Sequence, residues 1–152
     1  MNFIYRTSTC SNDLDCGRGR ICVFNQCIDD GTPRFTLLWE GEGLLDLSIR
    51  PPNGNAIRRD NMFDSISGGV LEDDSNDAKL NHVESISFGS TGLAVGGRYN
   101  VEIANNGDKA GIPWTLNVFV YGSLIQSFSG RDNDALVWDY DFAPFAVLPI
   151  NE

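Results

Sequence analysis

All four cysteines of the 152-residue chain lie between residues 10 and 27, and this cluster constrains the first part of the fold more than any other feature. So short a segment cannot bury a core of its own, and disulfides commonly replace the core in such segments. The spacing C-x5-C-x5-C-x4-C contains no Cys-x-x-Cys pair, which favours disulfides over a zinc site or free thiols. Four cysteines allow three pairings. We favour the interleaved one, Cys10 with Cys22 and Cys16 with Cys27, because interleaved bridges staple a short segment best.

The acidic composition narrows the range of partners. The chain has a formal net charge of −10. Nucleic acids and anionic membranes bind basic surfaces, so we expect neither as a partner. No apolar run approaches the roughly 20 residues that cross a bilayer, so we also expect no membrane insertion. An acidic surface favours solubility and suits cation binding.

From residue 35 onward, short alternating or apolar runs recur between Gly, Asn and Pro turn signals. This pattern predicts an all-β fold, an antiparallel β-sandwich or jelly roll with a short disulfide-stapled N-terminal segment. No window shows sustained 3.6-residue periodicity, so we expect little helix. DDGTP separates a cysteine-rich disulfide module at 1–31 from a β-sandwich domain at 32–152. The expected strands are FTLLWE, LLDLSIR, AIRR, GGVL, VESISF, RYNVEIA, WTLNVFV, SLIQSFS and ALVWDYDF, with YG joining WTLNVFV to SLIQSFS as a hairpin.

The stretch LEDDSNDAKLNHVE has the ligand order of a twelve-residue calcium loop. Calcium prefers six to eight hard oxygen ligands, and alternating side chains in a tight turn can surround it. Ala78 stands where an EF-hand loop has Gly, and the flanks look like strands, so this is not an EF-hand. The alternatives are a calcium loop on a β scaffold and an ordinary solvated turn. The spacing gives the candidate ligands Asp73, Ser75, Asp77, Lys79 through its backbone carbonyl, Asn81 and Glu84.

Two segments resemble known families. WEGEGLLDLSIRPPNGNAI, GGVLEDDSNDAKLNHVESISF and GGRYNVEIANNG are similar, in this order, to segments of the bacterial YfaP-like domains of unknown function and, more distantly, of pre-peptidase C-terminal domains. That resemblance implies a secreted or cell-surface sandwich with an acidic, cation-binding edge. It singles out Asp46, Asp73, Asp74 and Glu84, while Leu44 replaces one Asp of the family pattern. The cysteine cluster resembles small Dickkopf-like modules, which implies an oxidising or extracellular destination.

Aromatic residues give a candidate interface. We expect Trp39, Trp114 and Trp138 to be core or sheet-face residues. Trp138, Tyr140 and Phe142 alternate with acidic residues, and an aromatic face that stays exposed would be an interface. Both ends of the chain are also apolar. The candidate interface residues are therefore Phe3, Ile4, Tyr5, Trp138, Tyr140, Phe142 and Phe145.

No recognisable catalytic set is present in the sequence. His82 is the only histidine, and neither a G-x-S-x-G motif nor a phosphate-binding Gly loop occurs. Asp139 and Asp141 lie on one strand face, where solvated charges are more common than a glycosidase pair. We therefore predict that the protein is not an enzyme and that His82 is a turn residue or an outer-shell group of the acidic loop.

These observations favour a non-enzymatic, extracellular structural or adhesive protein that associates with itself in a filament, appendage or shell. Calcium is its expected cofactor, and strand addition to a sheet edge is a mechanism that fits. One alternative is a calcium-dependent module that binds a carbohydrate, peptide or other surface ligand. Another is a surface or decoration protein of a virion.

Overall fold

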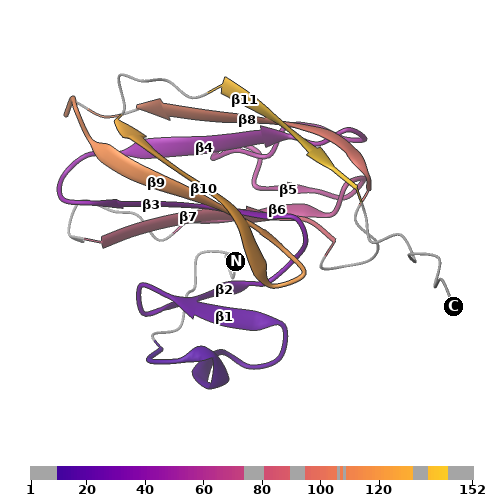
Figure 1. The fold of residues 1–152 in the computed structure, drawn as a ribbon, viewed down its shortest axis with the longest axis horizontal. Coiled ribbons are helices and arrows are strands. Elements are labelled where there is room, and N and C mark those ends of the chain that lie inside the picture. Colours follow the sequence, from indigo (N-terminus) through magenta and orange to yellow (C-terminus); the bar gives the residue numbers. More distant parts are fainter. Residues whose placement is uncertain are drawn as a thin grey trace, which may run out of the picture.

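The computed structural model describes residues 10–73, 81–89, 95–105, 107, 109–131 and 137–143. Three antiparallel sheets account for most of them (Figure 1). The strands are β1 (Arg20–Val23), β2 (Gln26–Asp29), β3 (Arg34–Glu40), β4 (Leu45–Arg50), β5 (Phe63–Asp64), β6 (Gly69–Asp73), β7 (Asn81–Ser87), β8 (Gly97–Asn105), β9 (Pro113–Val120), β10 (Ser123–Arg131) and β11 (Val137–Phe142), and a 3₁₀ helix covers Asp13–Cys16.

Two of the sheets form a sandwich. One has six strands in the order β10-β9-β3-β7-β6-β5, and the other has three in the order β11-β8-β4. All of the strand pairs in both sheets are antiparallel. The described residues contain no α-helix, and no helix among them has the length and apolar character that crossing a bilayer requires. The prediction of an all-β antiparallel fold is confirmed.

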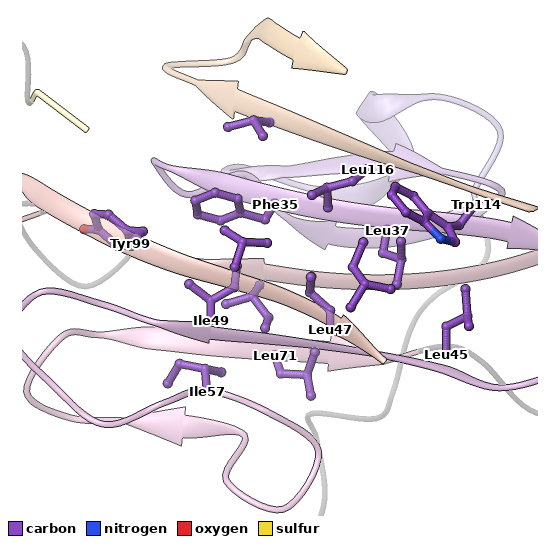
Figure 2. Packing of buried hydrophobic residues seen from close by; sticks show 14 of the residues in the cluster. Phe35, Leu37, Leu45, Leu47, Ile49, Ile57, Leu71, Tyr99, Trp114 and Leu116 are labelled. Carbon is purple, nitrogen blue, oxygen red and sulfur yellow. The ribbon is translucent and has the colours of Figure 1, made fainter. Parts of the chain in front are cut away.

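The core lies between the two sheets and follows from the alternation of the strands. β3 places Phe35, Leu37 and Trp39 on its inner side, all less than 3% exposed. Leu47 on β4 and Val101 on β8 face them from the opposite sheet and have no exposed surface. Figure 2 shows side chains from both sheets meeting in this layer. Burying one such side chain contributes about 1.5–3 kcal/mol, so the inner rows specify which face each strand turns inward.

The cysteine module has the predicted pairing. Cys10 is bonded to Cys22, with Cα atoms 5.9 Å apart, and Cys16 is bonded to Cys27, with Cα atoms 5.3 Å apart. Strands β1 and β2 form a hairpin inside this frame, with a two-residue turn at Phe24 and Asn25, whose φ angles are 47° and 64°. The bulky Phe24 therefore adopts a left-handed conformation that normally favours glycine or asparagine.

Charged groups hold the module on the outer face of the six-stranded sheet (Figure 1). The Arg20 guanidinium donates to Asp29 on β2 at 2.6 Å and to Glu72 on β6 at 2.8 Å. Glu72 also accepts the Asp29 backbone N–H at 2.6 Å. Burial is the largest influence on Glu72 and raises the pKa of this carboxyl. Arg34 on β3, 1% exposed, lies with its guanidinium 3.8 Å from the centre of the Phe119 ring.

The structure differs from the sequence predictions in three places. The run AIRR forms two isolated antiparallel bridges instead of a strand, Ile57 with Ile49 and Arg58 with Asn61, and the second of these closes a tight turn. The short strand β5 and the hairpin of the cysteine module have no clear alternating signal in the sequence. His82 lies within β7 and is 1% exposed, so its assignment to a turn is wrong; the strand starts earlier than the apolar pattern indicates.

Asp64 gives the fold a specific sensitivity to acid. Its carboxylate accepts the Ser67 backbone N–H and the Ser67 hydroxyl, both at 2.8 Å, in the turn between β5 and β6. The backbone hydrogen bond from Ser67 is the largest influence and lowers the pKa of Asp64. A carboxyl whose pKa is lowered by folding stabilises the fold at pH values above its ordinary pKa of about 3.9. This contribution is lost as the pH falls through the pKa of the folded state.

We therefore predict that Asp64→Ala lowers the free energy of unfolding by about 1–3 kcal/mol at neutral pH. The variant should lose less stability than the wild type below pH ~4, because it lacks the carboxylate that is protonated there. Urea denaturation at a series of pH values measures both effects. Asp60→Ala is the matched control, since the Asp60 side chain is 75% exposed. Parallel acid limbs for Asp64→Ala and the wild type would contradict the prediction.

Candidate functional site

Glu84 is a carboxylate buried between the two sheets. It lies on the inner side of β7 and has no exposed surface. Its Oε1 atom accepts the backbone N–H of Leu47 on β4 at 2.5 Å, so it ties one sheet to the edge strand of the other. A buried ionised carboxylate is stable only when hydrogen bonds and an opposite charge compensate its desolvation.

Arg59 supplies that opposite charge. Its Nη2 atom donates to Glu84 Oε2 at 3.0 Å, and its Nε atom donates to Asp46 Oδ1 at 2.8 Å. The Arg59 side chain is 41% exposed, so it reaches the buried carboxylate from the protein surface. A surface cleft of about 400 Å³ surrounds this arginine. The cleft is lined by Asp46, Ser48, Arg58, Arg59, Asp60, Glu102 and Ala104.

The structure brings together part of the predicted calcium set, but around an arginine. Asp46 and Glu84 share the Arg59 guanidinium, and Glu84 is further engaged by the Leu47 N–H. The Arg59 guanidinium therefore compensates both carboxylates here, and their role as calcium ligands stays a prediction. Asp73 ends β6 and pairs in register with Glu84, and the exposed Asn81 begins β7. Asp74, Ser75, Asp77 and Lys79 lie outside the described residues, so a calcium loop there remains a prediction.

Within the described part of the chain, the close groups of three metal-ligating side chains come down to Cys10, Cys16 and Cys22. All three sulfur atoms belong to disulfides. A disulfide sulfur is not a thiolate, and the thiolate is the species that binds zinc. This group is therefore a structural staple.

His82 is a buried residue that packs in the core. Its ring stacks on the Trp39 indole with centroids 4.9 Å apart, and its Nε2 atom lies 2.7 Å from the Gly41 carbonyl oxygen. A carbonyl oxygen can only accept, so Nε2 carries the proton of this hydrogen bond. With 1% of its surface exposed, the imidazole has no direct access to a substrate in solvent.

The aromatic residues of β11 also turn inward, which corrects their assignment to an interface. Phe142 is 3% exposed, and the Trp138 ring packs edge-on against Phe128 of β10 at 4.5 Å. Tyr140 packs edge-on against Phe35 at 5.9 Å. The side chains alternate as predicted, but this aromatic face packs against the core between the two sheets. Phe3, Ile4, Tyr5 and Phe145 lie outside the described residues.

A second cleft lies where the cysteine module meets the sheet. It has a volume of about 440 Å³, which is within the range of small-ligand pockets. Phe24, at the tip of the β1–β2 turn, forms one wall, and Leu38 on β3 forms part of the opposite surface. Trp39 and Trp114 also line it, although both are at least 95% buried, as expected for core residues. The remaining lining residues are Glu40, Pro113, Thr115, Ser129 and Gly130.

Removing the arginine tests whether Arg59 is what makes the buried Glu84 tolerable. We predict that Arg59→Met lowers the free energy of unfolding by about 3–5 kcal/mol, because it leaves a buried carboxylate without its cation. Adding Glu84→Gln should recover a large part of this loss, since a neutral amide still accepts the Leu47 N–H. Arg58→Met is the control and should cost less than about 1 kcal/mol, because Arg58 pairs with an exposed carboxylate. Equal losses from the two arginines would contradict the assignment.

Comparison with known proteins identifies no relative of this chain. No protein-family model matches the chain, and neither a curated protein nor a solved structure matches it. The similarity to YfaP-like domains therefore stays an expectation from the sequence, and function has to be argued from the residues and their geometry.

Proposed function

We propose that the chain is a non-enzymatic structural or adhesive subunit that works outside the cell and assembles with copies of itself. Two disulfides within the small N-terminal module support the extracellular part, because such modules persist in oxidising compartments. The assembly would be a filament, an appendage or a shell.

The observation that carries the proposal is an exposed apolar group at the start of β10. Tyr121 in the β9–β10 turn is 57% exposed, and Leu124 and Ile125 are 54% and 44% exposed. Single exposed apolar residues are normal on a protein surface. Tyr121, Leu124 and Ile125 lie close together in the sequence at one end of an edge strand, so association there would remove apolar surface from water.

The first test is the molar mass of the purified protein by light scattering over a range of concentrations. We predict species heavier than the 16.7 kDa chain, in calcium and also in excess chelator, because apolar contacts do not require a metal. Assemblies that dissociate only in chelator would contradict the prediction that association does not need a metal. They would instead indicate that the acidic loop binds calcium. A monomer at every concentration would overturn the proposed function.

The cleft beside Phe24 supports a second candidate function, the binding of a carbohydrate or peptide. Phe24 is held over the cleft in a left-handed conformation, and backbone strain of this kind often marks binding sites. Leu38 and Pro113 add apolar surface, while Thr115 and Ser129 offer hydroxyl groups. This mixture of apolar surface with a few polar groups is typical of ligand pockets.

Glycan and peptide arrays test this second function. If the cleft binds a ligand, Phe24→Ala should reduce array signals at least tenfold, because truncation removes the wall of the cleft. Leu14→Ala is the matched control, since Leu14 belongs to the same module and is 92% exposed. Arrays that stay blank with the wild type, or that respond equally to both variants, would eliminate the cleft as a ligand site.

A further inference from the structure

Among the described residues, the two sheets of the sandwich have four edge strands, and three of these edges carry protection against pairing with another chain. β5 has only two residues. β11 carries the exposed carboxylates of Asp139 and Asp141. On β4, the N–H of Leu47 is bonded to Glu84 and the N–H of Ile49 to the Ile57 carbonyl. Short length, charge and coverage are the usual means by which proteins block sheet edges.

β10 is the edge without such protection. It has nine residues and, in the described part of the chain, pairs with β9 alone. Its sequence SLIQSFSGR contains no carboxylate in a chain whose net charge is −10, and Arg131 is its one charged residue. A bulge between Leu124 and Gln126 interrupts only its first part, so the remainder of the edge is regular. Two acidic chains can approach each other here without opposing like charges.

We propose that β10 pairs with β10 of a second copy of this chain, antiparallel and around a two-fold axis. This inference rests on the proposed self-assembly and assigns its contact surface. The two six-stranded sheets would then form one continuous sheet. Main-chain hydrogen bonds would satisfy the open edge of both strands.

The inner and outer faces fix which registers such a pair can use. Opposed residues must lie on the same face, and Phe128 points inward toward Trp138. Pairing Phe128 with its own copy meets this condition and sets Ser127 of one chain opposite Ser129 of the other. Ser127 and Ser129 lie on the outer face, where they pair in register with Asn117 and Thr115 of β9. They are small and uncharged, so these two positions carry no charge against the approach of a second copy, although Phe24 of the cysteine module lines a cleft with Ser129 on the same face.

A charge-swap experiment tests the edge directly. Ser127→Glu/Ser129→Glu sets glutamates opposite each other twice and should weaken self-association about tenfold or more. Ser127→Lys/Ser129→Lys should do the same with lysines. An equimolar mixture sets each glutamate opposite a lysine and should restore association to within about threefold of the wild type. Sedimentation velocity measures all three samples, and circular dichroism checks that each variant is folded.

Thr115→Glu/Asn117→Glu is the matched control, because it adds the same charges to the same face on the neighbouring strand, away from the edge. This variant should retain most of the association. If it weakens association as much as the β10 variant, or if the mixture fails to restore association, the contact is not the β10 edge. If the protein forms oligomers and the β10 charge variants associate as strongly as the wild type, this inference is wrong, but the proposed function is not contradicted. A wild-type monomer would instead overturn both.

Discussion

The backbone at the sheet edges is the constraint on which this molecule depends. Every strand has hydrogen-bonding groups on both sides, and a sandwich of two open sheets leaves four sides without a strand partner. The chain treats these edges differently. It shortens β5, places carboxylates on β11 and covers β4, while it leaves the nine residues of β10 open and free of acidic groups. The proposed assembly through β10 would use the edge that the described part of the fold leaves open.

The coverage of β4 also explains why charged residues lie near the core. Glu84 receives the Leu47 N–H from the free side of β4, and Arg59 compensates the charge of that carboxylate while reaching Asp46 on the same strand. A few residues away, Ile57 completes the cover by bonding to Ile49. Asp46 and Glu84, two of the candidate calcium ligands, thus share the guanidinium of Arg59 in this structure. Such a pair fixes how the two sheets lie against each other, because the carboxylate cannot leave the arginine without remaining buried and uncompensated.

Sequence patterns within single strands and hairpins predict most of the fold. Alternation identified the inward row of β8, from Tyr99 to Ile103, and the two-residue turn between β9 and β10 because those signals lie within one strand or one hairpin. The interleaved disulfide pairing, which the sequence favours among three possible ones, is also confirmed. The sequence does not predict features that depend on contacts between residues far apart in the chain. Nothing in the sequence near Glu84 indicates Arg59, and the alternation in β11 does not reveal whether its aromatic face meets a core or solvent. The cleft at Phe24 likewise exists only because the module docks on the sheet.

Amide hydrogen exchange along β10, followed as the protein concentration is raised, measures the central claim most directly. Amides on the open side of this strand exchange freely in a single copy and become protected when a second strand bonds to them. The account predicts that protection within residues 123–131 increases with concentration, while the amides of β4 and β9 exchange at rates that do not depend on it. Exchange along β10 that stays the same from dilute to concentrated protein would contradict assembly through this edge.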